Sequence, residues 1–299
     1  MDKNFCLIGA AGYIAPKHMK AIKETGNNLL AVLDPSDSVG IIDSYFPNAD
    51  FFTEFERFDR HIEKLKYDEK KLVDYVSICS PNYLHDSHIR FALRSGANAV
   101  CEKPLVLNPW NIDKLKKIEE STSKKIYNIL QLRAHPTILK LRKQVLSNSV
   151  NKKYDIELKY ITSRGNWYKS SWKGDENKSG GIATNIGIHF FDMLHWVFGR
   201  TQINRVNRKE ENYIEGYLEL ENARINWFLS IDSSFLPKNV LAHGGSTFRS
   251  IKLNNKEIEF SRGFKDLHTR VYEDILTGKG YGLEDVRPSI EIVHKIRNS

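Results

Sequence analysis

Two short motifs place a lysine and a histidine where they could handle the proton of an alcohol. Lys103 lies in Glu102-Lys103-Pro104, directly after the apolar run Asn98 to Cys101, and His189 ends the triplet Gly187-Ile188-His189. An imidazole titrates at about pH 6.5, whereas a lysine amine, with a pKa of about 10.4, acts as a base only when its surroundings lower that pKa. The two residues could therefore hold and accept the proton of an alcohol during oxidation, and either could be the primary base.

A turn near the N-terminus predicts a helix start that binds an anion. The run Gly9-Ala10-Ala11-Gly12-Tyr13-Ile14-Ala15 follows a short apolar strand, and its small residues let backbone amides approach a pyrophosphate. Its spacing is G-x-x-G-x-x-A, whereas the usual dinucleotide fingerprint is G-x-G-x-x-G, so a plain strand-to-helix turn is the alternative. We assign cofactor contacts to Gly9, Ala11, Gly12, Tyr13 and Ile14.

Asp34 ends the second predicted strand and indicates which dinucleotide would bind. An acid about 20 residues after the glycines accepts hydrogen bonds from ribose hydroxyls, and its charge repels a 2′-phosphate. This favours NAD over NADP, with Ser36 and Ser38 lining the same pocket. The alternative is that Asp34-Pro35 only initiates a turn.

A third cofactor segment follows the strand predicted at Asp74 to Cys79. The loop from Ser80 to His85 would lie at the carboxyl edge of the sheet, where open α/β sheets bind ligands. His85 and His88 are three residues apart, but without a third ligand nearby they are weak evidence for a metal, and we expect none. The cofactor contacts predicted here are Ser80, Pro81, Asn82, Leu84 and His85.

The elements around these motifs predict an α/β chain of two domains. Short β-rich runs alternate with amphipathic helices up to about Leu130, which is typical of a doubly wound parallel sheet. The expected strands are Asn4 to Ile8, Leu29 to Leu33, Asp74 to Cys79, Asn98 to Cys101 and Lys125 to Ile129, and the helices are Pro16 to Glu24, Glu54 to Lys66, His85 to Arg94 and Pro109 to Ser121. We place the first domain at residues 1–131.

Residues 132–299 predict an α+β domain built on a large, open, mostly antiparallel sheet. Period-two runs follow a helix at Pro136 to Ser147, and a helix predicted at Ile182 to Phe198 interrupts them. The strands expected are Tyr154 to Thr162, Tyr213 to Leu220 and Arg224 to Ile231, and the last helix is Leu283 to Arg297. Between strand and helix lies a glycine- and aromatic-rich loop, Ser163 to Gly181.

Composition sets broad limits on the class of protein. The chain has 299 residues, 40% of them hydrophobic, and a net charge of +8. The basic residues are scattered among acids, so the charge indicates a solvated surface or a small substrate that carries phosphate or carboxylate, and it favours both over nucleic acid. It lacks a secretory leader and any run of about 20 apolar residues, so we expect a cytoplasmic protein without a membrane span. Cys6, Cys79 and Cys101 lie in apolar runs and are expected to be small buried residues.

Several segments together resemble the glucose-fructose oxidoreductase / inositol dehydrogenase / rhizopine-catabolism (Gfo/Idh/MocA) family. The broad likeness rests on Ser80-Pro81-Asn82, Leu84-His85, Glu102-Lys103-Pro104 and Gly187-Ile188-His189. A narrower likeness, to bacterial UDP-N-acetyl-D-glucosaminuronate (UDP-GlcNAcA) 3-dehydrogenases of O-antigen biosynthesis, rests on Gly9 to His18, Tyr127 to Arg133, Ile161 to Tyr168 and Ala183 to Gly187.

The resemblance implies a Rossmann domain, a C-terminal α+β domain and NAD-dependent oxidation of the sugar C3 hydroxyl to a ketone. The ketone would be the substrate of an aminotransferase that uses pyridoxal phosphate (PLP), within lipopolysaccharide biosynthesis. Some members of the family reoxidise bound NADH with 2-oxoglutarate, and the family also points to a homotetramer. Glu102 and Lys103 would then contact the cofactor as well.

The remaining site residues follow from the loop and from the resemblance. Arg164, Trp167, Tyr168, Trp172 and Lys173 crowd the loop, where aromatic faces and cations suit a sugar ring, a nicotinamide and anionic groups, although such aromatics can also simply pack. We expect Trp172 and Lys173 near the nicotinamide. Further contacts are expected from Gln131 to the cofactor, and from Lys103, Arg133, Arg164, Tyr168, Asn185, His189 and, more weakly, Arg249 to the substrate.

Asn185 departs from the broad family, which usually has an acid four residues before the histidine. An amide cannot ionise, so Asn185 can orient the sugar but cannot be the base. Asp192 could orient His189 from the next helical turn, and His195 is expected to be structural. The alternatives are an NAD-dependent dehydrogenase of another sugar or polyol, and a non-catalytic NAD-binding regulator with the same fold.

Overall fold

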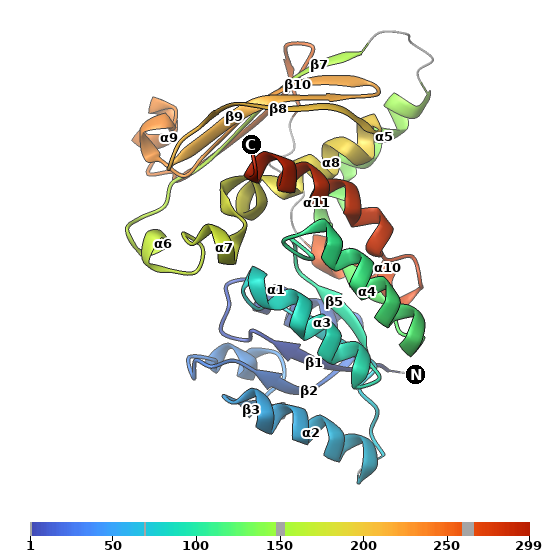
Figure 1. The fold of residues 1–299 in the computed structure, drawn as a ribbon. Helices are drawn as coiled ribbons and strands as arrows, with labels where there is room; N and C mark the ends of the chain where they lie inside the picture. Colours follow the sequence, from blue (N-terminus) through green and yellow to red (C-terminus); the bar gives the residue numbers. More distant parts are fainter. Residues whose placement is uncertain (1, 69, 148–152, 259–265) are drawn as a thin grey trace. The chain divides into compact units, whose positions relative to one another are not determined.

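The computed structural model describes residues 2–68, 70–147, 153–258 and 266–299. The chain divides into two compact units (Figure 1). Met1–Val106, Trp110–Gln131 and Asp266–Val286 make the first unit, whereas Leu107–Pro109, Leu132–Lys265 and Arg287–Ser299 make the second. The single domain boundary proposed after residue 131 does not include the return of the chain to the first unit at residue 266.

The first unit is built on a six-stranded parallel sheet with the order β3-β2-β1-β4-β5-β6. Its strands are β1 (Asn4–Ile8), β2 (Asn28–Leu33), β3 (Asp50–Phe52), β4 (Tyr75–Ile78), β5 (Asn98–Cys101) and β6 (Ile126–Asn128). The order reverses between β1 and β4, and ligands of such sheets bind outside the carboxyl ends of the strands at this point. The doubly wound fold is confirmed, whereas the short edge strand β3 was not predicted.

Amphipathic helices connect these strands because their apolar residues recur at helical spacing. In α2 (Phe55–Tyr67), for example, the buried residues Phe58, Ile62 and Leu65 lie on one face. The other connections are α1 (Ala15–Glu24), η1 (Gly40–Ser44), η2 (Asn82–Leu84), α3 (His85–Arg94) and α4 (Pro109–Thr122). Cys6, Cys79 and Cys101 are buried and unpaired, as expected of small core residues.

A helix from the C-terminal part of the sequence completes the first unit. Helix α10 (Leu267–Leu276) buries Leu267, Val271 and Ile275. It is attached to α1 by an ion pair between Lys20 Nζ and Asp266 Oδ1 at 2.5 Å and by a hydrogen bond from Thr269 to Glu24 at 2.7 Å. The sequence analysis did not predict α10.

The second unit contains a six-stranded sheet with the order β12-β11-β7-β10-β9-β8 (Figure 1). Its strands are β7 (Tyr154–Thr162), β8 (Thr201–Lys209), β9 (Tyr213–Leu220), β10 (Ala223–Ser230), β11 (Thr247–Leu253) and β12 (Lys256–Glu257). Among the described residues of this sheet only β7 and β10 pair in parallel, so the expectation of a mostly antiparallel sheet is confirmed. Strands β8, β11 and β12 were not predicted.

The helix predicted at Ile182 to Phe198 has two parts. A π-helical turn, η4 (Ala183–Gly187), precedes α8 (Ile188–Phe198). Gly187 permits this close packing, because a Cβ atom there would lie 2.5 Å from Leu229 Cδ1 on β10. Isolated π turns of this kind occur often at functional sites, and His189 follows directly.

The remaining helices of the described residues range from one turn to 15 residues. They are η3 (Gln131–Ala134), α5 (Pro136–Ser147), α6 (Trp167–Ser170), α7 (Glu176–Ser179), η5 (Ser233–Phe235), α9 (Lys238–Ala242) and α11 (Leu283–Arg297). The predicted loop Ser163 to Gly181 thus contains two of them. None of the described helices has the length and apolarity that crossing a membrane requires.

Candidate active site

The turn after β1 can hold a pyrophosphate only if residue 9 is glycine. Gly9 has φ +93°, and a Cβ atom there would lie 2.6 Å from the carbonyl carbon of Cys79 and 2.7 Å from the amide nitrogen of Ser80. Helix α1 begins with no side-chain cap on its first amides. The N–H groups of Ala15 and Lys17 donate to the carbonyl oxygens of Gly12 and Ile14 at 3.1 and 3.0 Å, and Pro16 has no N–H. The fit to a pyrophosphate therefore rests on the tight glycine turn and on the positive end of the α1 dipole.

Replacement of Gly9 by alanine should weaken NAD binding by more than tenfold and lower the free energy of unfolding by about 1–3 kcal/mol. Gly96→Ala is the matched control, because Gly96 has φ +90° but no atom within 4 Å of its added Cβ. The control adds only backbone strain. Isothermal titration measures the affinity for NAD, and urea unfolding measures the free energy of unfolding. Equal losses of affinity and stability in the two variants would refute the steric argument.

The Asp34 carboxylate makes the turn that the sequence offers as an alternative, and it also binds the glycine turn. Its Oδ1 atom accepts the N–H of Ser36 at 2.9 Å, which makes a turn, and its Oδ2 atom accepts the N–H of Ala11 in the glycine turn at 2.9 Å. The carboxylate thus ties the end of β2 to the proposed pyrophosphate turn. Its contact with ribose, like those of Ser36, Ser38, Tyr13 and Ile14 with the cofactor, stays a prediction.

The two histidines of the loop after β4 bind different partners. The buried His85 contacts the carbonyl oxygen of Pro104 through Nδ1 at 2.6 Å and that of Ser80 through Nε2 at 2.8 Å. His88 Nδ1 contacts the Ser80 hydroxyl at 2.8 Å, and burial lowers the pKa of His88 to about 4. His85 therefore fastens the loop to the segment that follows β5, whereas His88 is bonded to the loop itself. The cofactor contacts of Ser80, Pro81, Asn82, Leu84 and His85 stay predictions.

Glu102 and Lys103 lie directly after β5, at the carboxyl edge of the sheet. Lys103 is half-buried, and its peptide bond to Pro104 is cis. Asn128 Nδ2 donates to the carbonyl groups of Cys101 and Glu102 at 2.8 and 3.1 Å, which fixes the backbone here. Lys103 is therefore presented by an ordered backbone.

The Glu102 carboxylate is buried and bonded to residues that the sequence analysis missed. Its Oε1 atom lies 2.9 Å from His18 Nε2 and 3.1 Å from His268 Nε2. Burial alone would raise the pKa of Glu102, but these two hydrogen bonds outweigh it and hold the pKa well below its usual range. A histidine on the apolar face of α1 was the one signal in the sequence for part of this cluster.

Gln131, just after β6, has an unused hydrogen-bond acceptor. Its Oε1 atom is buried and has no hydrogen-bond partner among the described residues. A buried carbonyl oxygen without a partner is costly, so a ligand N–H group would stabilise it. This fits the carboxamide of a nicotinamide, and with the glycine turn it indicates that the first unit's residues suit NAD.

In the second unit, the loop after β7 gathers cations over aromatic faces. Lys173 Nζ lies 5.4 Å from the ring centroid of Trp167 and 5.1 Å from that of Trp172, and the Arg164 guanidinium lies 6.0 Å from the ring of Trp167. Burial and the charge of Arg164 lower the pKa of Lys173. Arg164, Trp167, Trp172 and Lys173 therefore lie close together, as the sequence predicts.

The segment around His189 meets the same loop. Asn185 Nδ2 donates to the hydroxyl of the buried Tyr168 at 3.0 Å, which joins η4 to α6. Burial raises the pKa of Tyr168. His189 itself is half-buried in the first turn of α8. A cavity of about 660 Å³ in this unit is lined in part by Tyr168 and Lys173.

Two arginines proposed as substrate contacts have other partners in the structure. The Arg133 guanidinium binds Asp192 through Nε at 2.9 Å and Nη2 at 2.7 Å, and both side chains are only 3% exposed. The Asp192 carboxylate is thus engaged by an arginine. Arg249 is exposed on β11, with its guanidinium 5.6 Å from the ring centroid of Tyr160. A substrate contact of either arginine stays a prediction.

Comparisons with known proteins agree with this geometry. The model of the NAD-binding Rossmann fold of the oxidoreductase family matches residues 3–129, and that of the family's C-terminal alpha/beta domain matches residues 142–240. Curated relatives include the Escherichia coli D-glucoside 3-dehydrogenase, 28% identical over 45% of this chain and 38% of that protein. The Bacillus subtilis glucose-6-phosphate 3-dehydrogenase is 25% identical over 74% of this chain and 65% of that protein. The chain thus spans less than two thirds of the length of these relatives.

Solved structures give a longer match. The WlbA (WbpB) dehydrogenase of Thermus thermophilus, in complex with NAD and UDP-GlcNAcA, is 51% identical, with a TM-score of 0.93 over 99% of this chain and 94% of that one. A second structure of that dehydrogenase, with NAD and alpha-ketoglutarate, has a TM-score of 0.94. On this evidence the chain belongs to the Gfo/Idh/MocA oxidoreductase family, with an NAD-binding Rossmann domain followed by the family's C-terminal α/β domain.

Proposed function

We propose that this protein oxidises the C3 hydroxyl of UDP-GlcNAcA to a ketone, with NAD as the oxidant. The observation that carries the proposal is the 51% identity, along 99% of the chain, with a dehydrogenase whose structure contains NAD and UDP-GlcNAcA. The names of the two curated relatives, which are 3-dehydrogenases of a glucoside and of glucose-6-phosphate, support C3 as the oxidised carbon.

Lys103 and His189 are the residues proposed to handle the proton. When bound, NAD supplies the acceptor for the hydride that leaves C3. Lys103 hydrogen-bonds the C3 oxygen, and His189 accepts or relays the hydroxyl proton; the reverse assignment fits the residue types equally well. Asn185 cannot ionise and is bonded to Tyr168, so its role is to orient the sugar.

The second unit supplies the charges that a UDP-linked uronic acid requires. Arg164 and Lys173 are cations held over aromatic rings in the loop after β7, and these rings can also stack on a sugar. The pyrophosphate and the carboxylate of the substrate are both anionic, so they favour such a loop over a neutral one. Arg133 and Arg249 remain weaker candidates for the same contacts.

Four further proposals concern the surroundings of the reaction. NADH is recycled in place by 2-oxoglutarate, supported by the relative's complex with NAD and alpha-ketoglutarate.

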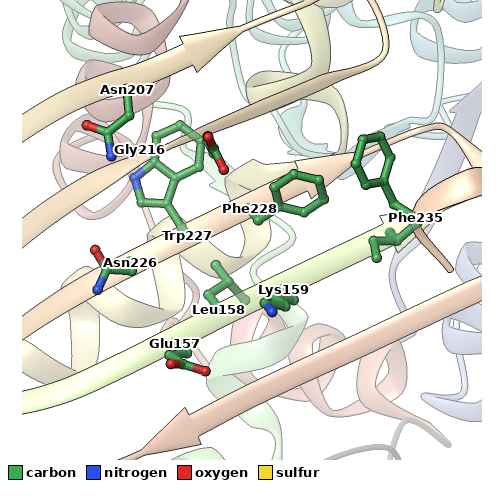
Figure 2. Close-up of a pocket in the computed structure, with 11 residues that line it drawn as sticks. Glu157, Leu158, Lys159, Asn207, Gly216, Asn226, Trp227, Phe228 and Phe235 are labelled. Atoms are coloured by element: carbon green, nitrogen blue, oxygen red, sulfur yellow. The ribbon is translucent and has the colours of Figure 1, made fainter. Parts of the chain in front are cut away.

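The protein is cytoplasmic, and a PLP aminotransferase consumes the ketone for lipopolysaccharide O-antigen synthesis. The protein is a homotetramer, supported by partly exposed aromatic residues on the second unit's sheet and the turn after it. Phe228 and Phe235 line a cavity of about 470 Å³ (Figure 2). The ring centroid of Phe228 lies 5.1 Å from that of Phe235 and 5.6 Å from that of Tyr213.

A substrate panel tests the proposal. Purified protein is incubated with NAD and, separately, UDP-GlcNAcA, UDP-N-acetylglucosamine, glucose-6-phosphate or inositol, with and without 2-oxoglutarate, and products are identified by mass spectrometry. We expect a product two hydrogens lighter only from UDP-GlcNAcA. Turnover of an uncharged sugar alone would show that UDP-GlcNAcA is not the substrate. Tight NAD binding without any turnover would favour a non-catalytic regulator.

A further inference from the structure

A chain of buried, hydrogen-bonded side chains crosses the first unit and ends at Glu102, next to Lys103. It runs from the Ser77 hydroxyl to the Tyr272 hydroxyl at 2.7 Å, and from there to His18 Nδ1 at 2.7 Å. His18 Nε2 then contacts Glu102 Oε1, which also contacts His268 Nε2. These side chains are 8% exposed or less, and they come from β4, α10, α1 and the end of β5.

The contacts fix where the protons lie. Burial lowers the pKa of His18, which favours the neutral ring with a single N–H. A carboxylate only accepts, so that N–H lies on Nε2 and points at Glu102, and Nδ1 accepts from the Tyr272 hydroxyl. Ser77 can then donate to the Tyr272 oxygen. Glu102 is left as an ionised carboxylate that also accepts the N–H of Lys103 at 3.3 Å.

His18, Glu102 and His268 are also the one group of ligand-type residues that the described chain brings together in a way that could hold a metal. Hydrogen bonding accounts for the same contacts without an ion. The two Nε2 atoms both approach a single Glu102 oxygen at hydrogen-bond distances, and the second nitrogen of His18 is engaged by Tyr272. We therefore interpret His18 and His268 as hydrogen-bond donors that fix the position of the Glu102 carboxylate.

The strand order indicates which end of the cofactor lies near Glu102. Asp34 at the end of β2 marks the adenosine side, and the Gly9 turn after β1 marks the pyrophosphate. The other half of the dinucleotide must then lie over the ends of β4, β5 and β6 on the far side of the switch point. Glu102 directly follows β5, and Gln131, with its unpaired oxygen, follows β6.

We infer that Glu102, held by His18, His268 and Tyr272, biases this site toward the oxidised cofactor, because its negative charge stabilises the cationic nicotinamide ring of NAD and not the neutral ring of NADH. The inference rests on the proposed use of NAD. Glu102 is a positioning and charge-setting residue in this account and does not exchange a proton with the substrate.

The test compares the two cofactor forms in the free protein, without any sugar. Dissociation constants for NAD and NADH are measured by fluorescence for wild type and Glu102→Gln. The ratio of Kd for NADH to Kd for NAD should fall by at least about threefold in the variant, because one charge at an effective dielectric constant of about 20 has an effect of this size or larger at separations up to about 20 Å. Glu119→Gln is the control, because Glu119 also accepts a backbone N–H in this unit, from Ile126 at 2.9 Å.

An unchanged ratio in folded Glu102→Gln would overturn the inference, as would an equal change in Glu119→Gln. A stoichiometric transition metal in the purified protein would also overturn it. If circular dichroism shows that Glu102→Gln does not fold, Glu102→Asp and Glu102→Asn are compared, since they differ only in charge. The readout needs no turnover, so failure of the proposed substrate leaves this test intact, whereas failure to bind NAD at all would refute the proposed function itself.

Discussion

Replacement of Lys103 by methionine should lower kcat for UDP-GlcNAcA oxidation by about 10²–10⁴-fold, the range attributed to a positioned acid–base group. Methionine keeps most of the side-chain volume of lysine but cannot bond the C3 oxygen or exchange its proton. Lys103 is half-buried at the carboxyl edge of the sheet, so the substitution leaves the core packing of the first unit intact. NAD affinity should therefore change by less than about tenfold, and the loss should appear in the chemical step.

Two further variants make this prediction specific. Lys125→Met removes an exposed lysine of the same unit, which lies 3.9 Å from Glu119, and should leave kcat unchanged. His189→Asn should also lose activity, and the double variant Lys103→Met/His189→Asn should lose less than the product of the two single effects if both residues act on one hydroxyl. Full multiplicative losses, or a Lys103→Met enzyme with wild-type kcat, would contradict the proposed pair.

Substitution of Asp192 by asparagine should lower the free energy of unfolding by about 3–5 kcal/mol, because it leaves the guanidinium of Arg133 buried without a counter-charge. The two side chains form a bidentate pair and are both 3% exposed. The Arg133 side chain also lies 5.6 Å from the ring centroid of Trp196. The pair joins η3 to α8, one turn after His189, so kcat should fall as well.

A variant that lacks both charges tests whether the unpaired charge causes the loss of stability. Arg133→Met/Asp192→Leu, which removes both charges, should be more stable than Asp192→Asn alone, because no unpaired charge remains. Glu211→Gln breaks the exposed pair with Lys169 and should change stability by less than about 1 kcal/mol. Urea unfolding of the four proteins gives all the values, and a small loss in Asp192→Asn would show that water reaches Arg133.

The parts of the fold that depend on local pattern could be predicted from the sequence. The glycine turn, Asp34 and the strand before Glu102 lie in short segments whose apolar runs and turn residues agree with one another. Their positions at the ends of β1, β2 and β5 follow from the parallel order of the sheet. The polar edge strand β8 was missed because its mostly exposed residues show no clear alternation of buried and exposed positions.

The contacts that set charge in the site could not be predicted. His268 and Glu102 are 166 residues apart, and their contact requires α10 to return to the first unit, which no local pattern indicates. Arg133 shows a related difficulty. Its charge suggested a substrate contact, but the partner found in the structure is Asp192, 59 residues later on another helix. Sequence identifies the type of such groups, whereas the tertiary structure decides their partners.

The most direct measurement uses UDP-GlcNAcA that carries deuterium at C3. The proposed function predicts that the deuterium is recovered in the reduced cofactor, that the sugar product is a ketone at C3, and that both signals are lost in Lys103→Met. A reduced cofactor without deuterium, or a carbonyl group at another carbon, would contradict the proposed reaction.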